Sequence, residues 1–127
     1  MTIDRKKILI VDEAGFSRIC SAILEKEGYG INAISDVRQI ESSVNYSDFG
    51  LVITSYPFGE LLFDKLKKTK IPTIILSDHL NKDVVMMLEH IGKSISHCMI
   101  KPLDYTKFRA LVHHVMRSND EHEGNNA

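Results

Sequence analysis

The hydrophobic residues of the chain gather into short, unbroken runs, separated by longer segments in which apolar and polar positions alternate with helical spacing. Unbroken runs are typical of strands covered on both faces, as in a parallel sheet. The runs that predict strands are Ile8–Val11, Ile31–Ile34, Leu51–Thr54, Ile74–Leu76 and Cys98–Ile100.

The segments between the runs predict helices. One apolar stripe has the spacing of a single helix face and consists of Phe16, Ile19, Cys20, Ile23 and Leu24. Gly28 is well placed to end that helix in a left-handed turn. A second stripe, for which Asp104 is a plausible N-cap, consists of Phe108, Leu111, Val112, Val115 and Met116. Weaker helical patterns cover Ser35–Asn45, Gly59–Lys68 and Asn81–Gly92.

A strand followed by a helix, repeated along the chain, predicts an α/β domain with a doubly wound, five-stranded parallel sheet, because parallel neighbours need crossover helices. The length of 127 residues suits one domain. We expect this domain to cover residues 1–118. The polar tail at residues 119–127 is expected to be disordered, since it has no aliphatic residue larger than alanine.

Composition narrows the classes of partner. Sixteen Lys and Arg residues stand against seventeen Asp and Glu residues, so the formal net charge is -1 and no global field favours nucleic acid or an anionic membrane. Cys20 and Cys98 lie in apolar runs without metal-ligand spacing, and we interpret both as reduced core residues. No run is long enough for a signal peptide or a membrane span, so a cytoplasmic location is expected.

Polar side chains follow the predicted strands at the edge where such sheets bind ligands. A carboxylate pair, two hydroxyls and an ammonium group are therefore expected to converge on one small basin. These residues are Asp12, Glu13, Ser55, Ser77 with Asp78, and Lys101 with Pro102.

Four motifs in this order, "ILIVDE", "LVITS", "IPTIILS" and "MIKP", resemble those of a response-regulator receiver domain, from about Lys7 to about Met116. The resemblance implies a flavodoxin-like (βα)5 fold and a bacterial two-component, or phosphorelay, pathway. In that family the acidic pair binds Mg²⁺, an aspartate after the third strand accepts a phosphoryl group, the hydroxyl and lysine contact it, and the Lys-Pro bond is usually cis. By position, Asp12 and Glu13 match the pair, Ser77 the hydroxyl, and Lys101 and Pro102 the last motif.

Three departures from the family bear on phosphoryl transfer. Ser55 occupies the phosphoacceptor position, although the chemistry needs a carboxylate both as nucleophile and as ligand of the cation. Cys98 replaces the aromatic switch residue three positions before the lysine. The loop "SYPFGEL" has its proline two residues after the acceptor position instead of about four. Together they predict a pseudo-receiver that has lost phosphoryl transfer.

Several of these residues also have simpler interpretations. Asp12 and Glu13 could cap the first helix, and their binding of Mg²⁺ is expected to be weak or absent. Ser55 is interpreted as a small hydroxyl that bonds to nearby backbone, in preference to phosphoserine. Lys101 is expected to pair with one of the two carboxylates. The segment Val84–Met87 is either core with one side chain left out or an adaptable partner surface.

Three functions remain open. The first is a signalling interaction module, not an enzyme, that needs no cofactor and acts on a separate protein through the face of the fourth helix, fifth strand and fifth helix, as a monomer or weak dimer. The second is an ordinary phosphoryl-accepting response regulator. The third is a flavin-binding electron carrier, which the two carboxylates of "DEAGFSR" disfavour because they would repel a flavin phosphate.

Overall fold

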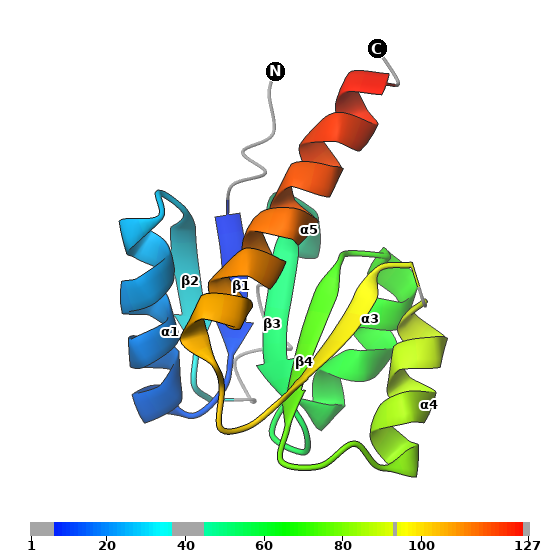
Figure 1. Ribbon diagram of the computed structural model, residues 1–127. Helices are drawn as coiled ribbons and strands as arrows, with labels where there is room; N and C mark the ends of the chain where they lie inside the picture. Colours follow the sequence, from blue (N-terminus) through cyan, green and yellow to red (C-terminus); the bar gives the residue numbers. More distant parts are fainter. Residues whose placement is uncertain (1–6, 37–44, 93, 126–127) are drawn as a thin grey trace.

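The computed structural model describes residues 7–36, 45–92 and 94–125, and in it a parallel sheet lies between helices (Figure 1). The sheet has five strands in the order β2-β1-β3-β4-β5. The strands are β1 (Lys7–Val11), β2 (Gly30–Ile34), β3 (Leu51–Ser55), β4 (Thr73–Ser77) and β5 (Ser96–Ile100). The helices are α1 (Ala14–Lys26), α3 (Phe63–Thr69), α4 (Lys82–Ile91) and α5 (Tyr105–Asn125), with short 3₁₀ turns η2 (Tyr46–Asp48) and η3 (Glu60–Leu62).

All neighbouring strands are parallel, so the predicted flavodoxin-like, doubly wound α/β fold is confirmed. The strand order reverses beside β1, which places the carboxyl ends of β1 and β3 next to each other. Crevices at such a switch point are where sheets of this type bind ligands.

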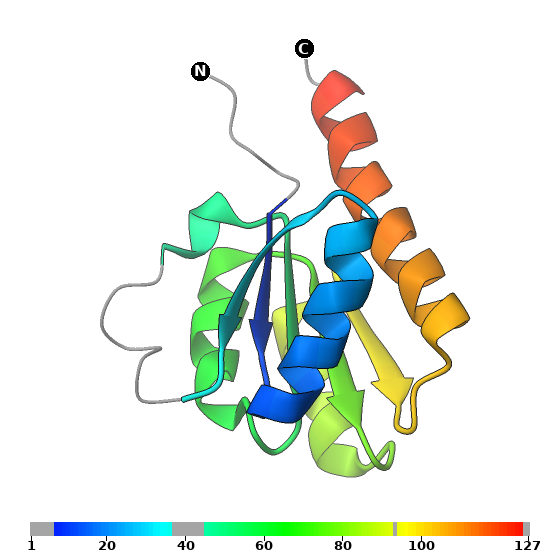
Figure 2. The same ribbon diagram turned by 90° about the vertical axis from the view of Figure 1, so that its left-hand side faces the viewer.

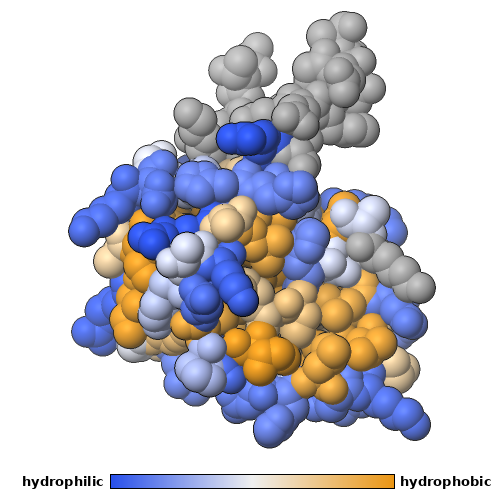
Figure 3. Space-filling model, in the orientation of Figure 1, coloured by the Kyte–Doolittle hydropathy of each residue, from blue (hydrophilic) through white to orange (hydrophobic). Residues whose placement is uncertain are grey.

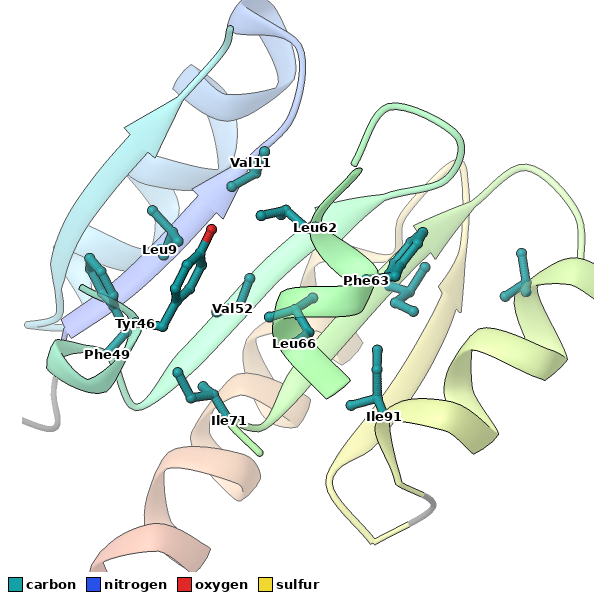
Figure 4. Close-up of a cluster of buried hydrophobic side chains, with 12 residues drawn as sticks. Leu9, Val11, Tyr46, Phe49, Val52, Leu62, Phe63, Leu66, Ile71 and Ile91 are labelled. Atoms are coloured by element: carbon teal, nitrogen blue, oxygen red, sulfur yellow. The ribbon is translucent and has the colours of Figure 1, made fainter. Parts of the chain in front are cut away.

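Each face of the sheet buries its own core. Alternate side chains of the strands point to opposite faces, so one core contains Ile8, Ile10 and Ile53, and the other contains Leu9 and Val52. Helices α1 and α5 cover the first face, and η2, α3 and α4 cover the second (Figure 2). Figure 4 shows this second core, in which η2 and α3 lay aromatic and aliphatic side chains over β1 and β3.

The ends of the helices follow the sequence signals closely. Gly28 has φ +94°, so the left-handed turn predicted after the first helix is confirmed, and Gly92, which follows α4, also has a positive φ of +128°. The Asp104 carboxylate accepts from the backbone N–H of Thr106 at 3.0 Å, which confirms the predicted N-cap of α5. Asn81 caps α4 in the same way, at 3.0 Å from the N–H of Val84.

Parts of three helical segments differ from the sequence-based expectation or lie outside the described residues. The tail was expected to be disordered from residue 119, but α5 continues to Asn125 and past the end of the sheet, because a helix that is already nucleated by buried turns extends at little cost (Figures 1 and 2). Ile19 belongs to the predicted apolar stripe yet is 49% exposed, since the stripe is wider than the strip of α1 that the sheet covers. The predicted helix Ser35–Asn45 falls mostly on 37–44, outside the described residues.

Within the part of the chain that the structure describes, no helix combines the length and the apolar character that crossing a bilayer requires.

Candidate functional site

Asp12 is the centre of a buried polar group at the carboxyl edge of the sheet. It follows β1 directly and its side chain is 1% exposed. Its Oδ1 accepts hydrogen bonds from the backbone N–H of Glu13 at 2.8 Å and from the Ser55 hydroxyl at 2.8 Å. A buried carboxylate is retained in a protein only where donors or a cation compensate for its lost hydration, and here both compensate.

Ser55 contacts Asp12 because β1 and β3 are neighbours in the sheet. It ends β3, is 4% exposed, and donates its hydroxyl proton to the Asp12 carboxylate. The expectation that this hydroxyl bonds to nearby backbone is therefore wrong. Its partner is a side chain 43 residues earlier, which local sequence could not indicate.

Lys101 brings the positive charge. Its Nζ lies 3.6 Å from Asp12 Oδ2, which confirms the predicted ion pair and identifies Asp12 as the partner. At 3.6 Å the contact is an ion pair without a hydrogen bond, and Asp12 Oδ2 has no hydrogen-bond partner among the described residues. The ammonium group also lies 4.3 Å from the centre of the Phe16 ring, a cation–π contact.

The other predicted residues lie at the same edge but do not join the group. Glu13 is exposed at the start of α1. Ser77 ends β4 and its hydroxyl donates to the carbonyl of His79 at 2.7 Å, so its hydrogen bond lies within the loop that follows β4. The Lys101–Pro102 bond is cis, as the resemblance implies, and so is Tyr56–Pro57.

The two cysteines are free thiols in apolar surroundings, as expected. The pKa of the Cys20 thiol is raised to about 12, mainly by burial and also by the charge of Asp12, while the charge of Lys101 opposes this rise. Burial also raises the pKa of Cys98, which is half-buried on β5, at the position where the resemblance predicts an aromatic switch residue, and packs against the α3/α4 core.

Three features of the site were not predicted. Phe16 was expected only as part of an apolar stripe, yet its ring lies against the Lys101 ammonium group. Gly59 lies so close to β3 that a Cβ there would overlap the Thr54 hydroxyl. Tyr56, the residue after Ser55, donates to Asp83 Oδ2 in the first turn of α4 at 3.2 Å, and burial and the charge of Asp83 raise the pKa of Tyr56.

These residues do not make a good magnesium site. Magnesium binds most tightly where several carboxylate oxygens are free to coordinate it. One oxygen of Asp12 is shared by two donors and the other faces an ammonium group, while Ser55, at the predicted acceptor position, supplies only a hydroxyl. Across residues 7–36, 45–92 and 94–125, no group of three or more His, Cys, Asp or Glu side chains is arranged to hold a metal ion.

Comparison with known proteins identifies the fold through structure alone. No protein-family model matches the sequence, and no curated protein matches it either. Among solved structures, NtrX from Brucella abortus in complex with ATP superposes with a TM-score of 0.78 at 20% identity, covering 94% of this chain, which spans 28% of NtrX.

Two structures of similar size agree. The non-phosphorylated HemR receiver domain from Leptospira biflexa has a TM-score of 0.74 at 18% identity, with 87% of this chain and 93% of that chain covered. A CheY-like response-regulator receiver domain protein from Methanospirillum hungatei has a TM-score of 0.70 at 19% identity, with 91% and 97% covered. The chain therefore has the fold of a response-regulator receiver domain.

Proposed function

We propose that this protein is a signalling interaction module on the receiver fold that works without aspartyl phosphorylation. The observation that supports this best is the hydrogen bond from Ser55 to Asp12. In a phosphoryl-accepting receiver the corresponding position carries a carboxylate, which is both the nucleophile and a ligand of the cation. A serine hydroxyl bound to a carboxylate provides neither function.

The charge of Asp12 is also partly neutralised within the pocket. Lys101 lies against the Asp12 carboxylate, where a divalent cation would otherwise be attracted. We therefore propose that the module needs no cofactor, binds Mg²⁺ weakly if at all, and is not an enzyme. Its action would be to bind a separate signalling protein in the cytoplasm, as a monomer or weak dimer.

The proposed binding face is formed by α4, β5 and α5. Val85 and Met86 are exposed on α4, where one exposed side chain was expected, and Ile100 is exposed at the end of β5. Figure 3 shows hydrophobic surface gathered over the side of the molecule where α4 and β5 lie. Exposed apolar patches on soluble domains frequently mark binding sites for other proteins.

Treatment with acetyl phosphate and Mg²⁺ tests the first part of the proposal. Intact-mass spectrometry should detect no phosphoryl adduct that hydroxylamine removes, because no acyl phosphate can form on Ser55. Such an adduct would establish the alternative, a phosphoryl-accepting response regulator. A Ser55→Asp variant treated in parallel shows that the reagent is competent if it becomes labelled.

A flavin-binding electron carrier remains the minor alternative, because flavodoxins share this strand order. Asp12 occupies the first loop with its charge buried, and this charge opposes a flavin phosphate. The absorption spectrum of the purified protein separates the two ideas, since bound flavin absorbs visible light and the proposed module does not.

A further inference from the structure

The turn that follows α3 differs from the turns that follow α1 and α4. After α1 and α4 the chain takes a positive φ at a glycine, Gly28 and Gly92 respectively. After α3 it does so at Lys70, with φ +60°, and no other non-glycine residue in the described part of the chain has a positive φ. This backbone conformation is disfavoured for a residue with a Cβ and free of strain for glycine, so a lysine here has a cost in stability.

Lys70 belongs to a group of cations at the end of the helix. Lys67 and Lys68 occupy the last turn of α3, and all three side chains are exposed; we call them the α3 lysine cluster. In the described part of the chain none of the three is ion-paired. No acidic residue occurs from Lys65 to Pro72, although the whole chain has a net charge of -1, so positive charge is concentrated at this point.

Helix stability accounts for part of this group. Cations in the last turn of a helix interact favourably with the carbonyl end of its dipole, which explains Lys67 and Lys68. It does not explain Lys70, because glycine would end the helix with less strain and two cations are already present. Backbone strain that is retained in a fold is a reason to look for a function of the residue.

We propose that the α3 lysine cluster is a binding surface for an acidic segment of a partner protein. The cluster lies where α3 leads into β4, at the amino edge of the sheet and opposite the edge that holds Asp12 and Ser55. It is therefore a surface separate from the pocket. An acidic segment would gain charge-assisted contacts from three adjacent ammonium groups while leaving the pocket unchanged.

The composition of the cluster favours an acidic peptide over the other polyanions. The cluster has no aromatic side chain on which a base could stack, as single-stranded nucleic acids require. It also has no exposed apolar side chain to insert into a lipid surface.

Fluorescence anisotropy with a labelled oligoglutamate peptide at low salt tests the proposal. The triple variant Lys67→Gln/Lys68→Gln/Lys70→Gln should bind roughly tenfold more weakly, as expected for the loss of three exposed ion pairs. A control triple, Arg18→Gln/Lys26→Gln/Lys107→Gln, removes the same charge from exposed positions on α1 and α5, across the sheet. It should bind the peptide like the unmodified protein.

Lys70→Gly separates the role of the charge from the role of the fold. It should raise the melting temperature by about 2 °C, because strain is relieved, and weaken peptide binding by about twofold, because one cation is lost. Equal weakening by the two triple variants would overturn the proposal in favour of a net-charge effect. So would tighter binding of a short DNA duplex or of phosphatidylserine vesicles than of the peptide, or a Lys70→Gly variant with undiminished peptide binding.

Discussion

At the scale of single residues, the net charge of the pocket predicts how a third carboxylate would change its affinity for Mg²⁺ and the stability of the protein. Asp12, Glu13 and Lys101 together carry a formal charge of -1, and Ser55 adds none. Ser55→Asp would bring the total to about -2 and supply a further oxygen ligand, so Mg²⁺ affinity should rise. Without metal, the new charge beside buried Asp12 should lower stability by roughly 1–3 kcal/mol.

Calorimetric titration with Mg²⁺ and thermal melts with and without the ion measure both effects. Ser94→Asp is the matched control, because it adds the same charge at an exposed position in the turn before β5. Equal Mg²⁺ binding by the unmodified protein and the Ser55→Asp variant would mean that this residue does not occupy the acceptor position.

Thiol reactivity is a second prediction at the scale of single residues. The Cys20 side chain is fully buried and its pKa is raised to about 12, so at pH 8 almost none of it is the reactive thiolate. Ellman's reagent should label Cys98 slowly and Cys20 only after unfolding. In a Cys98→Ser variant, the native protein should therefore show no reactive thiol at pH 8. Rapid labelling of that variant would contradict the burial of Cys20.

At the scale of the elements, substitution of alanine for glycine is expected to have opposite effects on stability at two positions. Gly59→Ala should destabilise the protein by about 1–3 kcal/mol, because its Cβ would overlap the Thr54 hydroxyl on β3. Gly15→Ala should stabilise it by roughly 0.5–1 kcal/mol, since Gly15 lies in α1 with no atom within 4 Å of the added Cβ. Urea denaturation of both variants measures the difference, and a destabilised Gly15→Ala would show that α1 is packed differently.

The elements were predictable from sequence where one physical rule dominated. Strand β3 is a continuous apolar run, and it lies within a sheet that buries both faces. Gly28 ends α1 and Asp104 caps the start of α5, as the sequence rules for helix ends predicted. Lys70 was not predicted, because sequence rules assign left-handed turns to glycine.

Contacts between distant residues were harder to predict than elements. The pairing of Lys101 with a carboxylate was foreseen, because the carboxyl ends of parallel strands converge. The hydrogen bond from Ser55 to Asp12 and the one from the Ser77 hydroxyl to the His79 carbonyl were not foreseen. A hydroxyl rotates to whichever acceptor the folded backbone presents, and the sequence does not contain that geometry.

At the scale of the whole molecule, the proposed binding face predicts the result of an affinity pull-down. Met86→Lys/Ile100→Lys places charges on α4 and β5 where side chains are already exposed, so the fold should tolerate them and partner capture from native cell extract should be lost. Ile19→Lys is the control, since Ile19 is 49% exposed on α1, outside that face. Loss of the same partner with Ile19→Lys would indicate a binding surface elsewhere.

The domain as a whole is expected to hold one conformation. A switch between two states needs a ligand that binds them with different affinity. Under the proposed function, Ser55 and Cys98 stand where a switching receiver has its acceptor carboxylate and its switch aromatic. Relaxation-dispersion NMR should detect no concerted exchange across α4 and Cys98. Concerted exchange across these regions would contradict this prediction and indicate an equilibrium between two states.

The hydrogen bond between Ser55 and Asp12 bears on how long a signal carried by this protein would last. A phosphorylated aspartate hydrolyses, so a receiver that carries one holds its signal only for the lifetime of that bond. A hydroxyl bound to a neighbouring carboxylate has no comparable decay. Under the proposed function, the duration of the signal would follow the synthesis and degradation of the protein, and its strength would follow the concentrations of the two partners.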